Sequence, residues 1–134
     1  MRYAIVYVSN ASEDLEKNQI NEILNNSKKW NNDNDITGLL LFSGGNFFQI
    51  IEGEKKTIIE LFQNIQSDNR HHNIMQILGK DIHKPAYDGF ESDFVSEESY
   101  YDPEKFHEYL NQIKVLEPSA QLAVKNILKA FLPI

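Results

Sequence analysis

The sequence predicts an α+β fold in which two helices cover one face of a single sheet. Strand-length runs of β-branched and aromatic residues alternate with longer segments whose apolar residues recur at helical spacing. Two of the strand-like runs are separated only by GGN at 44–46, a composition typical of a tight hairpin turn. No linker, repeat or low-complexity stretch interrupts the 134 residues, which favours one structural domain.

The first half of the chain predicts a strand, a helix and a hairpin. The run YAIVYVS at 3–9 is rich in β-branched and aromatic residues. Residues 10–30 begin with asparagine and serine, which favour a helix N-cap, and continue with helical spacing. The hairpin pairs residues 36–43 with residues 47–53.

The second half predicts a helix at 54–67, a strand at 72–82 and a possible fifth strand at 87–96. Asp102 and Pro103 are suited to begin a further helix. Its expected apolar stripe is Phe106, Tyr109, Leu110 and Ile113. A last helix is expected after Pro118, and its expected apolar positions are Leu122, Ile127 and Phe131.

The glutamine at position 49 is unusual because it lies in an apolar strand. The order strand-helix-strand-strand-helix-strand is that of a ferredoxin-like sandwich, in which the first and third strands are central neighbours. Gln49 shares its strand face with Phe47 and Ile51. A buried amide without a partner costs about 1–3 kcal/mol. We expect Tyr7, on the neighbouring strand, to point toward the same helix layer and to bond this amide.

The first helix carries an apolar stripe that ends in two polar residues. Ser27 and Asn31 continue the stripe at helical spacing. They could border a ligand that needs hydrogen bonds. Alternatively, Ser27 faces a cavity water, Asn31 ends the helix, and Tyr7 is an ordinary half-buried strand tyrosine. The apolar members of the stripe are Ile20, Ile23 and Leu24.

Composition excludes several classes of function. The chain has no cysteine, so disulfides and thiolate chemistry are excluded. Its net charge of −7 argues against direct nucleic-acid binding. No apolar run approaches the roughly 20 residues that span a bilayer, so we expect no membrane contact. The N-terminal segment alternates like a strand and is too short for a signal peptide, which indicates a cytoplasmic protein.

The sequence offers weak support for metal binding or hydrolytic catalysis. His71 and His72 are adjacent in a predicted strand and should point to opposite faces, so we expect no metal site. Glu13, Asp14 and Glu16 fit a solvated helix start. No Ser-His-Asp or paired-carboxylate arrangement can be argued from the spacing.

Four segments, in order and at these spacings, resemble the BLUF domain, the family of blue-light sensors that use flavin. They are YVS at 7–9, NNDNDITGLLLF at 31–42, GNFFQIIEG at 45–53 and DNRHHNI at 68–74. The resemblance implies a flavin-binding core over residues 1–100. Residues 101–134 would form a C-terminal helical extension packed on that core within a single structural domain.

The resemblance also implies roles for individual residues. Tyr7 matches the tyrosine that gives an electron and a proton to the excited flavin. Gln49 matches the switching glutamine, whose amide bridges that tyrosine and the flavin N5/O4 edge. Asn31 matches the asparagine that holds the pyrimidine edge of the ring. The other implied cofactor-binding residues are Ser27, Arg70 and His71, near the ring or its ribityl and phosphate end, and Ile23 and Ile65, which sandwich the ring.

The chain departs from the family pattern at four positions. Phe90 stands where the family usually has tryptophan, and Ser92 where it has methionine, so both positions bear on signal relay. Asn64 replaces a common arginine, and Trp30 replaces a frequent asparagine, so these two bear on cofactor affinity.

The resemblance implies a blue-light photoreceptor that binds FAD noncovalently and accepts FMN or riboflavin. Because the chain ends soon after the sensor, we expect no enzyme activity, and signalling through a homo-oligomer or an unknown downstream protein partner. The alternative is a flavin-free ferredoxin-like module that binds a protein or a metabolite. Colour discriminates the two, because a flavin protein purifies yellow.

Overall fold

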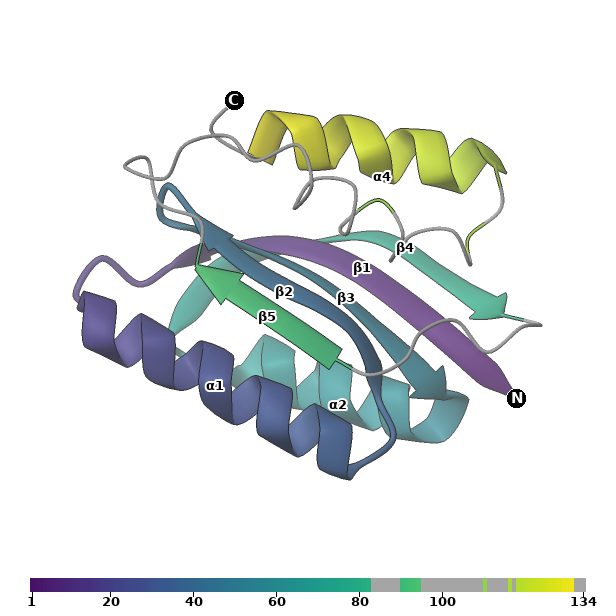
Figure 1. Cartoon of the computed structure of the whole chain (residues 1–134), viewed down its shortest axis with the longest axis horizontal. Helices are drawn as coiled ribbons and strands as arrows, with labels where there is room; N and C mark the ends of the chain where they lie inside the picture. The colour runs from purple at the N-terminus through teal and green to yellow at the C-terminus, as the bar shows by residue number, and fades with distance from the viewer. Residues whose placement is uncertain (83–89, 95–109, 111–115, 117, 132–134) are drawn as a thin grey trace.

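The protein is described from a computed structural model, which places residues 1–82, 90–94, 110, 116 and 118–131; for Phe90–Phe94 and Phe131 only the backbone is described. The helices and strands keep the labels of Figure 1. They are β1 (Arg2–Ala11), α1 (Lys17–Asp33), β2 (Thr37–Ser43), β3 (Asn46–Glu54), α2 (Lys55–Ser67), β4 (His71–Ile82), β5 (Phe90–Phe94) and α4 (Pro118–Phe131).

The strands form one sheet in the order β4-β1-β3-β2-β5. The two central strands, β1 and β3, are antiparallel, and their register places Tyr7 opposite Gln49. The fifth strand, β5, joins the edge of the sheet parallel to β2. The predicted ferredoxin-like α+β fold with an extra strand is therefore confirmed.

Helices cover both faces of this sheet. Figure 1 shows α1 and α2 on one side of it and α4 on the other. The layer with α1 and α2 buries alternate strand residues such as Ile5, Leu40 and Ile51. The opposite layer buries Val6 and Phe48, among others, against α4. Among the described residues, no helix has the length and apolar character needed to cross a membrane.

The first helix begins later than its sequence predicts. β1 continues to Ala11, whose N–H donates to the Gly45 carbonyl at 2.9 Å, and α1 begins only at Lys17. Glu16 is the N-cap, and its N–H donates to the side-chain oxygen of Gln19 at 2.8 Å. The expected caps, Asn10 and Ser12, were therefore wrong, because pairing with the hairpin turn keeps the chain extended as far as Ala11.

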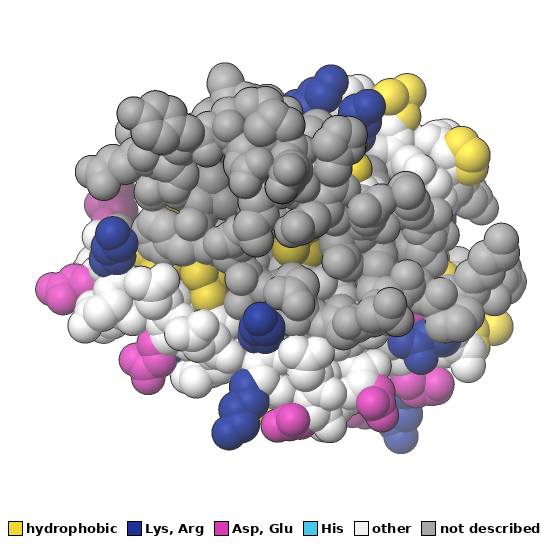
Figure 2. Space-filling view, in the orientation of Figure 1, with side chains coloured by type: hydrophobic (Ala, Val, Ile, Leu, Met, Phe, Trp, Pro, Cys, Tyr) yellow, Lys and Arg dark blue, Asp and Glu magenta, His cyan; other side chains and the backbone are white. Residues whose placement is uncertain are grey.

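The expected solvated helix start was wrong for two of its three carboxylates. Glu13 and Asp14 precede α1, and Asp14 accepts a hydrogen bond from the Ser12 hydroxyl. That contact lowers the pKa of the Asp14 carboxyl. In the space-filling view of Figure 2, acidic and basic side chains intermix along the lower part of the molecule, where α1 lies in Figure 1.

The apolar face of α4 also differs from the expected one. Leu122 is 61% exposed, whereas Ala120, Val124 and Leu128 are buried against the sheet. Ile127 is partly buried against this cluster, as expected, but Leu122 lies about 140° from it around the helix and faces away. Leu110 is partly buried against the same cluster. The other expected stripe residues, Phe106, Tyr109 and Ile113, lie outside the described residues, as does the Phe131 side chain.

A glycine lets β2 pair closely with β3. Gly38 has a φ of +140°, and a Cβ there would lie 2.0 Å from the Ile50 carbonyl oxygen. Gly38 also pairs with Phe90 across the parallel edge. No side chain fits this position without moving the sheet backbone.

We predict that Gly38→Ala lowers the free energy of unfolding by about 2 kcal/mol or more, because the new methyl group meets backbone rather than a movable side chain. Urea denaturation followed by circular dichroism measures the loss. Gly44→Ala is the matched control: Gly44 has a φ of +56° and nothing within 4 Å of an added Cβ. A Gly38 variant no less stable than the Gly44 variant would contradict this account.

Candidate functional site

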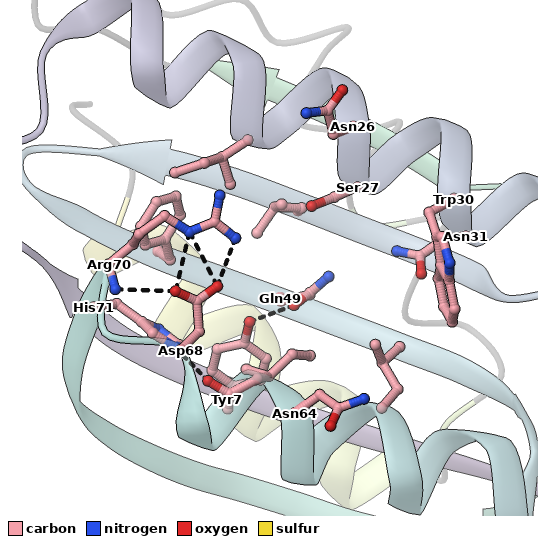
Figure 3. Close-up of a pocket in the computed structure, with 15 residues that line it drawn as sticks. Tyr7, Asn26, Ser27, Trp30, Asn31, Gln49, Asn64, Asp68, Arg70 and His71 are labelled. Carbon is pink, nitrogen blue, oxygen red and sulfur yellow. Dashed lines mark hydrogen bonds and ion pairs between the residues drawn. The ribbon is translucent and has the colours of Figure 1, made fainter.

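A cavity of about 280 Å³ lies between the sheet, α1 and α2. Figure 3 shows side chains from both helices and from the central strands meeting around it. From β1, β2 and β3 it is lined by Tyr7, Leu40, Phe47 and Gln49. Its other lining residues are Ile23, Asn26, Ser27, Trp30 and Asn31 of α1, Leu61, Asn64 and Ile65 of α2, and Asp68, Arg70 and His71 after α2.

Tyr7 and Gln49 meet at the floor of this cavity. The Tyr7 hydroxyl donates a hydrogen bond to the Gln49 side-chain oxygen. Both residues are almost fully buried, at 3% and 4% exposure. In Figure 3 the Gln49 amide nitrogen points away from Tyr7 into the space between the helices. Among the described residues this NH₂ group has no hydrogen-bond partner.

The Tyr7 phenol stays protonated at physiological pH. Burial raises the pKa of Tyr7 far above its ordinary value, and the negative charge of Asp68 raises it further. The Phe62 ring lies 5.5 Å from the Tyr7 ring, and the His71 ring lies 6.3 Å from it edge-on. Packed in this way, Tyr7 is a fixed hydrogen-bond donor to Gln49.

Asn31 presents a second buried amide to the cavity. Its exposure is 3%, and it lies within α1, which ends at Asp33. Its backbone carbonyl accepts from Asn34 and Ile36, but its side chain has no partner among the described residues. Figure 3 shows this side chain directed inward from α1. Ending the helix is therefore not a sufficient explanation for Asn31.

The segment after α2 brings an ion pair to the cavity. The Asp68 carboxylate accepts from Arg70 Nε at 3.0 Å and from Nη2 at 2.5 Å, and it also accepts from the Arg70 backbone N–H at 3.0 Å. The guanidinium holds the pKa of Asp68 below its usual range. Both side chains are partly in water, so the pair orders this turn more than it stabilises the fold.

His71 ties the end of α2 to β1. Its Nε2 lies 2.6 Å from the Ile65 carbonyl oxygen, and its Nδ1 lies 2.8 Å from the hydroxyl of buried Ser9. Because a carbonyl only accepts, Nε2 must carry a proton. Both ring nitrogens are therefore engaged by the protein, and a ligand in the cavity would meet the ring edge of His71.

The neighbouring histidine, His72, points away from this cavity. His72 is exposed and borders a separate hollow near Asn10 and Asn46, so the adjacent histidines diverge as strand geometry predicts. Within residues 1–82 and the other described positions, no three His, Asp or Glu side chains are close enough to hold a metal ion.

The structure gathers the eight predicted cofactor-binding side chains around one cavity. They are Tyr7, Ile23, Ser27, Asn31, Gln49, Ile65, Arg70 and His71. The predicted relay residues Phe90 and Ser92 belong to β5 and pair with Gly38 and Leu40 of β2; their side chains lie outside the described residues.

Sequence reasoning missed several lining residues. Asp68 was not singled out, although its position two residues before Arg70 is a usable signal for a local ion pair. Leu40, Leu61 and Asn26 also line the cavity, and no pattern in the sequence distinguishes them from ordinary core or surface residues. Trp30 and Asn64, singled out only as departures from a family pattern, also line the cavity.

Comparison with known proteins identifies relatives with the same domain. Residues 3–92 match the family BLUF, described as sensors of blue-light using FAD. The blue light- and temperature-regulated antirepressor BluF of Escherichia coli is 33% identical over 78 residues, which are 58% of this chain and 19% of that protein. The photoactivated adenylate cyclase subunit beta of Euglena longa is 29% identical over 83 residues, 62% of this chain and 10% of that protein.

Solved structures agree in fold. The photo-activated state of BlsA superposes on this chain with a TM-score of 0.69 at 26% identity. The match covers 98% of this chain and 94% of the BlsA chain. Klebsiella pneumoniae BlrP1 superposes with a TM-score of 0.76 at 26% identity, over 98% of this chain and 34% of that chain.

The match to the curated relatives spans about a fifth of their length or less, so the likeness concerns their sensor domain. The family match runs from β1 into β5 and includes every residue around the cavity. This chain therefore belongs to the BLUF family of blue-light flavin photoreceptors.

Proposed function

We propose that this cavity holds the isoalloxazine ring of a flavin noncovalently and that light acts through the hydrogen bond between Tyr7 and Gln49. The observation that carries the proposal is that the Gln49 NH₂ group and the Asn31 side-chain amide are buried, face the cavity and have no hydrogen-bond partner among the described residues. Each buried polar group left without a partner costs about 1–3 kcal/mol. A flat ring whose edge carries carbonyl oxygens and ring nitrogens satisfies both.

The size of the cavity supports a ring-centred site. This cavity has a volume of about 280 Å³, just below the range of roughly 300–1,000 Å³ that is common for ligand pockets. Such a space suits the ring system, while the tail of a larger flavin would extend outward. We therefore propose FAD as the cofactor, with FMN and riboflavin also accepted.

Different residues around the cavity would contact different parts of the flavin. Ile23 of α1 and Ile65 of α2 are apolar walls that would enclose the two faces of the ring and exclude water. Asn31 would hold the pyrimidine edge, and Ser27 would border the ring. Arg70, with His71 beside it, would lie near the ribityl and phosphate end. Asp68 limits the charge that Arg70 offers there.

Tyr7 and Gln49 form the proposed switch. The flavin, when bound, supplies absorption of blue light and an excited ring that accepts an electron. Tyr7 would donate an electron and its phenol proton and regain both within the same cycle, so that no net oxidation or reduction remains; the phenol proton already points at the Gln49 oxygen. A primary amide can exchange its donor and acceptor ends by rotation or tautomerism. After the exchange, Gln49 would bond the ring carbonyl more strongly.

The sheet register suggests a relay for the signal. Tyr7 pairs with Gln49, Gln49 with Leu40, and Leu40 with Ser92, so the four residues form one row across the sheet. We propose that β5, with Phe90 and Ser92, carries the change at Gln49 toward the C-terminal segment. A few kcal/mol of difference between two packings is enough for such a relay.

We further propose that the chain acts as a cytoplasmic sensor rather than an enzyme, and that its output passes through self-association or a protein partner. The antirepressor named among the relatives supports a protein partner. The photoactivated adenylate cyclase of Euglena longa matches over only 10% of its length, so the same domain also occurs within a larger enzyme.

The first prediction of this proposed function concerns cofactor binding. The protein purified from cells, or its apoprotein mixed with riboflavin, should be yellow and should release unmodified flavin on denaturation, because no covalent link is proposed. Absorbance of the protein fraction after gel filtration is the measurement. A protein that stays colourless in the presence of riboflavin, FMN and FAD would rule the proposal out in favour of a flavin-free module.

The second prediction concerns the amide. Gln49→Leu should keep the flavin and lose the small reversible red shift under blue light, because leucine has neither donor nor acceptor. Difference absorbance spectra before and after illumination measure the shift. Gln63→Leu makes the same change on the exposed side of α2 and should respond normally. A normal red shift in the Gln49 variant would refute its role.

The third prediction concerns the phenol. Tyr7→Phe removes the hydroxyl and conserves the ring, so packing and flavin binding should persist. The normal photocycle should be lost, which transient absorption spectroscopy would show. Tyr3→Phe, on the same strand and the same face of the sheet, is the control. Equal product yield in the Tyr7 variant and the unaltered protein would contradict the assignment.

A further inference from the structure

The single tryptophan of the chain borders the cavity. Trp30 lies next to Asn31 and one turn after Ser27 on α1. Figure 3 shows Trp30 beside Asn31, across the cavity from Arg70 and His71. Its backbone is fixed, because its carbonyl oxygen accepts from both the backbone and the side-chain nitrogens of Asn34, at 3.1 and 2.8 Å. The point from which the indole projects is therefore set by a well-defined helix end.

The indole itself is left half in water. Trp30 is 48% exposed, although tryptophan is highly buried on average. Among the described residues it forms no aromatic pair, and its indole N–H has no hydrogen-bond partner. Its neighbour Asn31 is only 3% exposed, so the exposure is particular to position 30 and does not reflect fraying of α1.

We propose that Trp30 is a ligand-contacting residue that covers the outer edge of the flavin ring, beyond the faces enclosed by Ile23 and Ile65, at the end of the cavity near Asn31. The inference rests on the proposed function. A flat tricyclic ring held by Asn31 and Gln49 would come within reach of the adjacent indole, and offset or edge contacts between aromatic rings are favourable. Binding would remove apolar indole surface from water, which is favourable.

A docking surface for a protein is the competing explanation for an exposed tryptophan. The position of Trp30 argues against it, because the indole borders the cavity together with the buried, partnerless amide of Asn31. By contrast Leu122, which is 61% exposed on α4, borders neither this cavity nor the hollow beside His72. Leu122 therefore provides a matched control for a large exposed apolar side chain.

The proposal makes a specific statement about ligand preference. Riboflavin, FMN and FAD share the ring and differ only in the tail. If Trp30 contacts the ring, its loss lowers the affinity for all three flavins by the same factor. If it stacks instead on the adenine, only FAD binding weakens.

The test is the dissociation constant of each flavin in the dark, by titration of the apoprotein, for the unaltered protein and for Trp30→Ala, Trp30→Phe and Leu122→Ala. Trp30→Ala should weaken all three flavins about tenfold, and Trp30→Phe only about threefold, because phenylalanine keeps part of the aromatic contact. Leu122→Ala should bind as the unaltered protein does. Circular dichroism confirms that each variant is folded.

A second measurement does not depend on a substitution. The one indole N–H gives one signal in a ¹⁵N NMR spectrum, and riboflavin should shift it strongly through the ring current. An unmoved indole signal, unchanged affinities in Trp30→Ala, or a loss confined to FAD would each overturn the proposal. These outcomes differ from failure of the proposed function, in which the unaltered protein binds no flavin at all.

Discussion

The pairing of β1 with β3 is the constraint on which the site depends. It places Tyr7 directly opposite Gln49 and is held at both ends by polar side chains. At one end Arg2 Nη2 lies 2.9 Å from a carboxylate oxygen of buried Glu52, which also accepts from the Thr37 hydroxyl at 2.6 Å. At the other end the Asn10 amide donates to the Asn46 side-chain oxygen at 2.6 Å.

These end contacts matter because a strand register can slip. A shift of one residue would turn every side chain of β3 to the other face, moving Gln49 out of the cavity and into the layer under α4. The same slip would leave Glu52 as a buried charge without Arg2, which is strongly unfavourable. The ion pair between Arg2 and Glu52 therefore stabilises the strand register that keeps Gln49 in the cavity.

Much of the fold and the site can be predicted from local patterns, and the exceptions have physical reasons. Alternation along β1 and β3 fixes which residues face α1 and α2, so the pairing of Tyr7 with Gln49 follows from strand order. The start of α1 does not follow, because Ala11 bonds Gly45 of the distant hairpin. The buried face of α4 is decided by docking on the sheet rather than by hydrophobicity, since Leu122 is more apolar than Ala120 but remains exposed.

The alternation of β3 also explains how one strand can serve both layers. Gln49 faces the cavity, while its neighbours Phe48 and Ile50 belong to the cluster that contains Val124 and Leu128 of α4. Movement of the β3 backbone at Gln49 would therefore be felt on both faces, because the close-packed core transmits strain. Contact continuity alone does not make a signal; it requires two packings whose balance the amide changes. The path from one face of the sheet to the other is short, since it runs through β3 and needs only Gln49 and its neighbours in that strand.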